Sequence, residues 1–186
     1  YWSVRAEKGI ERPIFSISSI DAPCYPQNTW FIADLKSSQG SVNMIPVTAE
    51  AIIAKKTLDE GELNKFVSNI YDWYRTCPFD DADYHPADLQ VTIDSSYQIK
   101  VTAKVAGAQH GSTPHQNRAN GANPVVSLTN FLAFLVERDV LANNRFGEMC
   151  KFIRWAFGTR PFGENHPDLL YRFDPVYGEG NGTSYG

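Results

Sequence analysis

His110 is the residue of this sequence best placed to carry out chemistry. It lies in the segment Gly107–Pro114 among glycine, alanine and serine residues, which are too small to bury an imidazole or shield it from a ligand. An imidazole N–H there can donate a hydrogen bond to a carbonyl oxygen that gains negative charge during a reaction. The backbone N–H groups of Gly111, Ser112 and Thr113 follow directly and could bind a carboxylate. The alternative is a plain turn in which His110 makes only a local hydrogen bond.

Asn43 is the second candidate for a site residue. It stands in the run Ser41–Pro46, where its neutral amide could fix a substrate or assist at the same developing oxyanion. The alternative role is structural, because asparagine also holds turns such as one before Pro46. The residue types leave both interpretations open.

A strand and a helix are expected on either side of His110. From Tyr97 to Val105 apolar and polar residues alternate, which predicts a strand over residues 97–106 with one buried face. Downstream, Asn123 can cap a helix and Pro124 suits its first position, and apolar residues then recur at helical spacing. A helix over residues 124–137 is therefore expected.

The remaining elements predict an α+β fold. Asp59 followed by Glu62 resembles a capping box, and an apolar face predicts a helix over residues 60–76. A further helical pattern surrounds residues 146–155 and ends at Gly158. Extended structure is expected at residues 30–36, 42–53 and 89–94. The order of strands, helix, hairpin and helix predicts an antiparallel sheet with helices packed on one face.

Two motifs resemble a known family. Gly107–Pro114 followed by Asn120-Gly121-Ala122 before an apolar helix resembles the signature of the lid, or dimerisation, domain of the di-metal zinc peptidases. Ser41–Pro46 is similar to the same family's Asn-x-(Val/Ile)-Pro segment, and Glu7-Lys8-Gly9 resembles the entry to the lid in bacterial Xaa-His-type dipeptidases. The family also includes aminoacylases and carboxypeptidase G. The resemblance covers most of residues 7–140.

The resemblance implies a ferredoxin-like lid that closes over a di-metal site. His110 would then be the catalytic residue that stabilises the oxyanion during peptide-bond hydrolysis, and Asn43, Gly111, Ser112 and Thr113 would bind substrate. The implied cofactor is a pair of zinc ions in the parent enzyme's catalytic domain. The implied partners are that catalytic domain, a dipeptide or small N-acyl substrate, and a second copy bound through the lid.

No metal ligand is assigned within this chain. The family's metal-binding motifs have no match in it, and the fragment alone is expected to be inactive. The cluster Asp80–His85 is interpreted as a solvated acidic loop, because such a run usually marks solvent-exposed chain. His115 has no carboxylate nearby, and His166 with Asp168 is explained more simply by a helix start.

Composition narrows the class of protein. The chain has 186 residues, 42% of them hydrophobic, and a net charge of −4, which is not basic enough to indicate nucleic-acid binding. No apolar run is long enough to cross a bilayer. Three scattered cysteines indicate reduced thiols and a cytoplasmic protein.

Three segments are expected. Residues 1–10 form a linker from the catalytic domain, residues 11–140 the lid, and residues 141–186 a helical and irregular extension where a second lid half would start. A non-catalytic α+β association module is the alternative function. The lid of a deacetylase- or desuccinylase-type relative is another.

Overall fold

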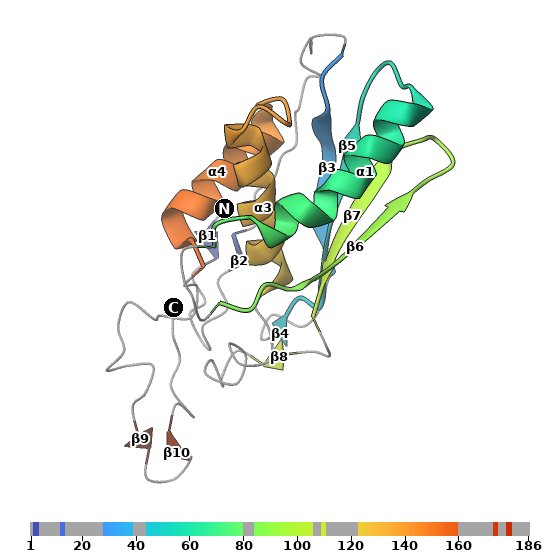
Figure 1. Cartoon of the computed structure of the whole chain (residues 1–186). Coiled ribbons are helices and arrows are strands. Elements are labelled where there is room, and N and C mark those ends of the chain that lie inside the picture. The colour runs from blue at the N-terminus through green and yellow to red at the C-terminus, as the bar shows by residue number, and fades with distance from the viewer. Residues whose placement is uncertain are drawn as a thin grey trace.

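The computed structural model describes residues 2–3, 12–13, 28–38, 44–79, 84–105, 109–110, 123–159, 173–174 and 178–179. Its centre is a four-stranded antiparallel sheet in the order β3-β5-β7-β6 (Figure 1). The strands are β3 (Phe31–Ser37), β5 (Thr48–Ala54), β6 (Asp88–Ile93) and β7 (Ile99–Lys104). The predicted α+β class with an antiparallel sheet is confirmed.

Three helices in the described part of the chain accompany the sheet: α1 (Glu60–Arg75), α3 (Pro124–Glu137) and α4 (Arg145–Phe157). They agree with the helices expected at residues 60–76, at 124–137 and around 146–155. Short two-residue strands complete the set: β1 (Trp2–Ser3), β2 (Arg12–Pro13), β4 (Met44–Ile45), β8 (Gln109–His110), β9 (Phe173–Asp174) and β10 (Gly178–Glu179).

The chain runs through the sheet as two hairpins, each followed by a helix. Strands β5 and β6 both pair antiparallel with β7, so they are parallel to each other with β7 between them. Helix α1 connects them and completes a split β-α-β unit, the element of ferredoxin-like folds. The chain order, however, is ββαββα followed by α4, whereas a ferredoxin-like chain runs βαββαβ.

All three helices contribute to one hydrophobic core on one face of the sheet. Alternate residues of β5 and β7 point into it, as the strand period requires. Helix α3 packs on these two strands and on α4 (Figure 1), and it is buried along nearly its whole length because it has neighbours on both sides. Helix α4 also contributes Phe146 and Cys150 to the core shared with the sheet, although both follow the lid boundary expected at residue 140.

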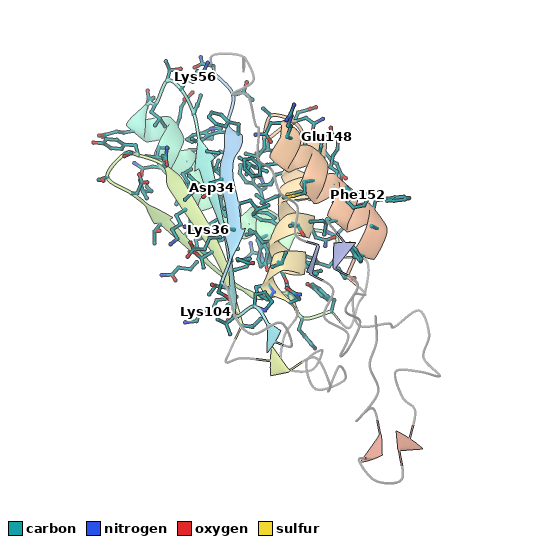
Figure 2. The ribbon with its side chains drawn as sticks, turned by 180° about the vertical axis from the view of Figure 1, so that it is seen from behind. Asp34, Lys36, Lys56, Lys104, Glu148 and Phe152 are labelled. Carbon is teal, nitrogen blue, oxygen red and sulfur yellow. The ribbon has the colours of Figure 1, made fainter. Side chains whose placement is uncertain are left out.

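The opposite face of the sheet is polar. Lys36 and Lys100 place their ammonium groups 3.4 Å and 2.8 Å from the carboxylate of Glu50. Figure 2 looks at the molecule from behind, and Asp34, Lys36 and Lys104, all exposed, lie along the sheet there. The described residues therefore leave this face to solvent.

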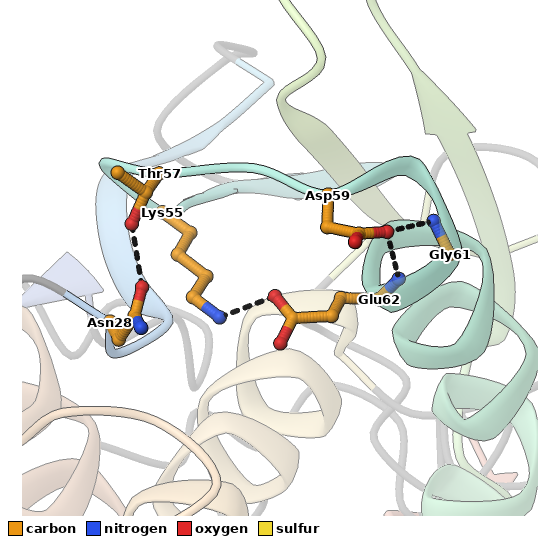
Figure 3. A network of polar contacts seen from close by, with 6 residues as sticks. All are labelled: Asn28, Lys55, Thr57, Asp59, Gly61 and Glu62. Carbon is orange, nitrogen blue, oxygen red and sulfur yellow. Dashed lines mark hydrogen bonds and ion pairs between the residues drawn. The ribbon is translucent and has the colours of Figure 1, made fainter.

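Only one side of the expected capping box forms at the start of α1. Asp59 is the N-cap, and its carboxylate accepts hydrogen bonds from the backbone N–H groups of Gly61 and Glu62 at 2.6 Å and 3.4 Å (Figure 3). The Glu62 carboxylate pairs instead with Lys55, at 2.7 Å. That ammonium also lies 5.7 Å from the centre of the Trp30 ring, and its side chain is only 6% exposed.

The strand expected over residues 97–106 starts two residues later than its alternation indicates. Tyr97 has φ 58°, a left-handed conformation outside the strand region. It belongs to the turn between β6 and β7, where the Asp94 carboxylate accepts hydrogen bonds from the N–H groups of Ser96 and Gln98 at 2.8 Å and 2.9 Å. The turn, rather than the alternation of side chains, therefore determines where β7 begins.

Candidate functional site

Two segments far apart in the sequence meet in the short ribbon formed by β4 and β8. The pairing is antiparallel, with Met44 opposite His110 and Ile45 opposite Gln109. Both strands lie beyond one end of the main sheet (Figure 1). The ribbon therefore brings Met44, the residue that follows Asn43 in the chain, opposite His110.

The ribbon continues the central strand pair after an irregularity. The β5–β7 ladder ends at Thr48 opposite Lys104, and the Val105 N–H donates to the Val47 carbonyl at 3.1 Å. Two residues separate Ile45 from Thr48, whereas four separate Lys104 from Gln109, so the ribbon pairs in a different register from the sheet.

The helix that follows the candidate site begins as expected. Asn123 is the N-cap, its side-chain oxygen accepts from the Val125 N–H at 2.9 Å, and Pro124 occupies the first turn. His110 thus precedes, in the chain, a helix whose first residues are fixed by their own cap.

Of the predicted site residues, the structure describes only His110. For His110 the structure describes the backbone, in β8, and not the side chain. Asn43, Gly111, Ser112 and Thr113 lie outside the described residues, as do His115, His166 and Asp168. Their roles stay predictions. His85 is exposed, and residues 80–83 beside it lie outside the described ranges.

Among the described residues, no group of three or more His, Cys, Asp and Glu side chains could hold a metal ion. These described residues therefore do not fit a paired zinc site.

The described cysteines are buried. Cys150 is fully enclosed in the core, and burial raises the pKa of its thiol to about 12. Cys77 is buried as well. A thiol with so high a pKa is a poor nucleophile at neutral pH, so Cys150 serves packing. No helix in the described ranges combines the length and apolar character needed to span a membrane.

A buried polar network fixes residues 84–87 against α3, and the sequence patterns did not indicate it. The Ser127 hydroxyl lies 2.7 Å from the Tyr84 hydroxyl and accepts from the Ala87 N–H at 3.0 Å. Tyr74 donates to the Ala87 carbonyl at 2.6 Å, and burial raises the pKa of its phenol. The signal in the sequence is a serine within a largely apolar helix. The network stabilises the fold, since each group in it has a partner.

Comparison with known proteins leaves the family open, because no protein-family model and no curated protein matches the chain.

Proposed function

We propose that this chain is the lid domain of a metal-dependent dipeptidase or related amidohydrolase. In this role it closes over a di-metal site in a separate catalytic domain and supplies residues that bind substrate and stabilise the oxyanion. The proposal rests on the resemblance of the segments around Asn43 and His110, and the fold gives it independent support.

One observation carries that support. The two motifs were selected by sequence alone and are separated by more than sixty residues, yet Met44 lies opposite His110 in one ribbon. Motifs that serve one site must be brought together by the fold, whereas unrelated turns need not be. The pairing of β4 with β8 is the arrangement that a shared site requires.

His110 is proposed to donate a hydrogen bond to the carbonyl oxygen of the substrate as negative charge develops on it. Asn43 is proposed to fix the substrate or assist at the same oxygen, and the N–H groups of Gly111, Ser112 and Thr113 to bind its carboxylate. The lid would complete the site only when it closes, which excludes water from the reaction.

Two zinc ions in the catalytic domain are proposed to supply the activated water for hydrolysis. The proposed substrates are dipeptides or small N-acyl compounds, and the proposed compartment is the cytoplasm. Neither nucleic acid nor a membrane is proposed as a partner.

The proposal is tested on a full-length protein that contains this chain. It should hydrolyse dipeptides, hold zinc at stoichiometric levels, and lose activity when a chelator removes the metal. The isolated 186-residue chain is the matched control and should hold no stoichiometric zinc and hydrolyse no dipeptide. A full-length protein without zinc and without amide hydrolase activity would refute the proposal, as would one tightly held zinc ion in the isolated chain.

Association is the second candidate function, and the edges of the sheet favour it. At the β3 edge, the Ala142 N–H donates to the carbonyl of Trp30, just before the strand, and the Asn144 side chain to that of Ile32, at 2.7 Å each. At the β6 edge, the Tyr71 hydroxyl accepts from the Val91 N–H at 3.1 Å, and Ile93 is 40% exposed. An edge strand that is covered so little can pair with another strand.

Strand pairing through β6 would make the chain a homodimer, either as a non-catalytic module or as the dimeric lid of a deacetylase- or desuccinylase-type relative. Sedimentation of the wild type and of Thr92→Pro, which disrupts β6, separates the two dimeric alternatives from a monomeric lid. A dimer lost in the variant favours association. Amide hydrolase activity in the full-length protein then separates the relative from the non-catalytic module.

A further inference from the structure

Ser38 binds Val47 and Thr48, where the chain passes from the β4–β8 ribbon into β5, and we propose that its hydroxyl is a positioning group for His110. The functional part of this inference rests on the proposed role of His110. The contacts of Ser38 do not depend on that role.

Ser38 directly follows β3 and makes three hydrogen bonds with residues 47–48, where β5 begins. Its N–H donates to the Thr48 carbonyl at 2.9 Å. Its hydroxyl oxygen accepts from the Val47 N–H at 3.1 Å and from the Thr48 N–H at 3.2 Å. One side chain therefore holds two successive backbone N–H groups where β5 begins.

This arrangement turns the backbone. In a regular strand, successive residues face opposite sides, so two consecutive N–H groups do not reach one acceptor. Pro46, which is buried, has a fixed φ and no N–H to continue a ladder. The hydroxyl of Ser38 thus stabilises a bend at Val47, at which the chain leaves the sheet for β4.

Hydrogen bonds connect this bend to His110. The N–H of Val47 is bound by Ser38, and the carbonyl of Val47 accepts from the Val105 N–H at 3.1 Å. Val47 is therefore held from both neighbouring strands. Two residues before it, Ile45 pairs with Gln109, and Met44 pairs with His110. A change in the direction of the bend moves β4, and β8 with it.

Removal of the hydroxyl should loosen the ribbon more than the sheet. In Ser38→Ala the N–H groups of Val47 and Thr48 lose their acceptor, and both bonds are partly buried. The other end of the β5–β7 ladder, where Ile53 pairs with Ile99, is five residues along β5 from Thr48. The effect is thus expected to be local and to extend toward His110.

Amide hydrogen exchange of the isolated chain, followed by NMR, tests this. In Ser38→Ala the amides of Val47, Thr48 and the ribbon should exchange about tenfold faster or more, while those of Ile53 and Val101 keep their rates. Ser38→Thr, which keeps a hydroxyl, should restore protection. Ser37→Ala, which changes the exposed neighbour on β3, should leave the ribbon unchanged. If Ser38→Ala does not fold, Ser38→Cys, with a weaker acceptor, should show the same pattern.

Acceleration at Val47 and Thr48 with wild-type rates in the ribbon would overturn the inference, as would a Ser38→Thr variant that fails to restore protection. In the enzyme that carries this lid, Ser38→Ala should lower kcat about tenfold with little change in KM, and Ser38→Thr should restore it. If His110→Ala leaves kcat unchanged, the proposed function fails, and the exchange rates still decide the role of Ser38.

Discussion

The carboxylate of Glu50 is held between two ammonium groups on neighbouring strands, Lys36 on β3 and Lys100 on β7. The hydrogen bond from Lys100 is the main cause that lowers the pKa of Glu50, and Lys36 adds to it. A carboxyl whose pKa is lower in the folded state stabilises the fold above its ordinary pKa. That contribution is lost as pH falls through the folded-state pKa.

In Glu50→Gln the free energy of unfolding should therefore fall less steeply as the pH is lowered. Urea unfolding at a series of pH values, from neutral down through the ordinary range of glutamate, measures this. Lys100→Gln should flatten the same part of the curve, because it removes the main partner of Glu50. A Glu50→Gln variant that loses stability with acid as steeply as the wild type would show that the pair contributes nothing to the pH dependence.

Single residues show which parts of the structure are local enough to predict from sequence. The caps at Asp59 and Asn123 were predicted correctly, because a cap binds N–H groups only two or three positions away. The partner of Glu62 was not, since Lys55 reaches it only after β5 and α1 are packed. Tyr97 was placed in a strand because its side chain fits the alternation, whereas its backbone follows the turn.

At the scale of elements, Asn144 connects α4 to the edge of the sheet. Its side-chain oxygen accepts from the Gly147 N–H at 2.9 Å, which caps the helix, and its amide donates to the Ile32 carbonyl at 2.7 Å. The residue is only 6% exposed, so neither partner would regain a bond to bulk water without rearrangement.

Asn144→Ala should lower the free energy of unfolding by about 2–3 kcal/mol, since it removes a cap and leaves a buried carbonyl without its donor. The adjacent Asn143→Ala is the matched control. Asn143 is exposed and bonds Glu148 at the surface, so about 0.5 kcal/mol or less is expected. Urea unfolding of both variants gives the difference. Equal effects at the two positions would contradict the buried role of Asn144.

The helices and long strands were predictable because each repeats a local pattern. The pairing of β4 with β8 was not, because two-residue strands show no period and the paired residues Met44 and His110 are 66 positions apart in the sequence. Ser38 could not be recognised either, since its role depends on where the strand beside it bends. The residues of the candidate site were found by resemblance, whereas the pairing of Met44, which follows Asn43 in the chain, with His110 was found in the structure.

At the scale of the whole molecule, one face of the sheet carries all three described helices and the other is polar. Helix α3 is largely apolar around its circumference, which predicts burial on both sides. In the structure it lies between the sheet and α4. The ribbon with His110 projects beyond one end of this body (Figure 1).

The most direct test measures kcat of the His110→Ala variant in a full-length protein that contains this chain. We expect kcat to fall on the order of a hundredfold or more, as for loss of one oxyanion donor, with metal content and folding unchanged. Asn43→Ala should show a weaker loss. In the double variant the increase in activation free energy should be less than the sum of the two single effects, because both groups address one oxygen. His115→Ala, the matched control in the same region, should retain kcat. An unchanged kcat in His110→Ala would contradict the proposed lid function.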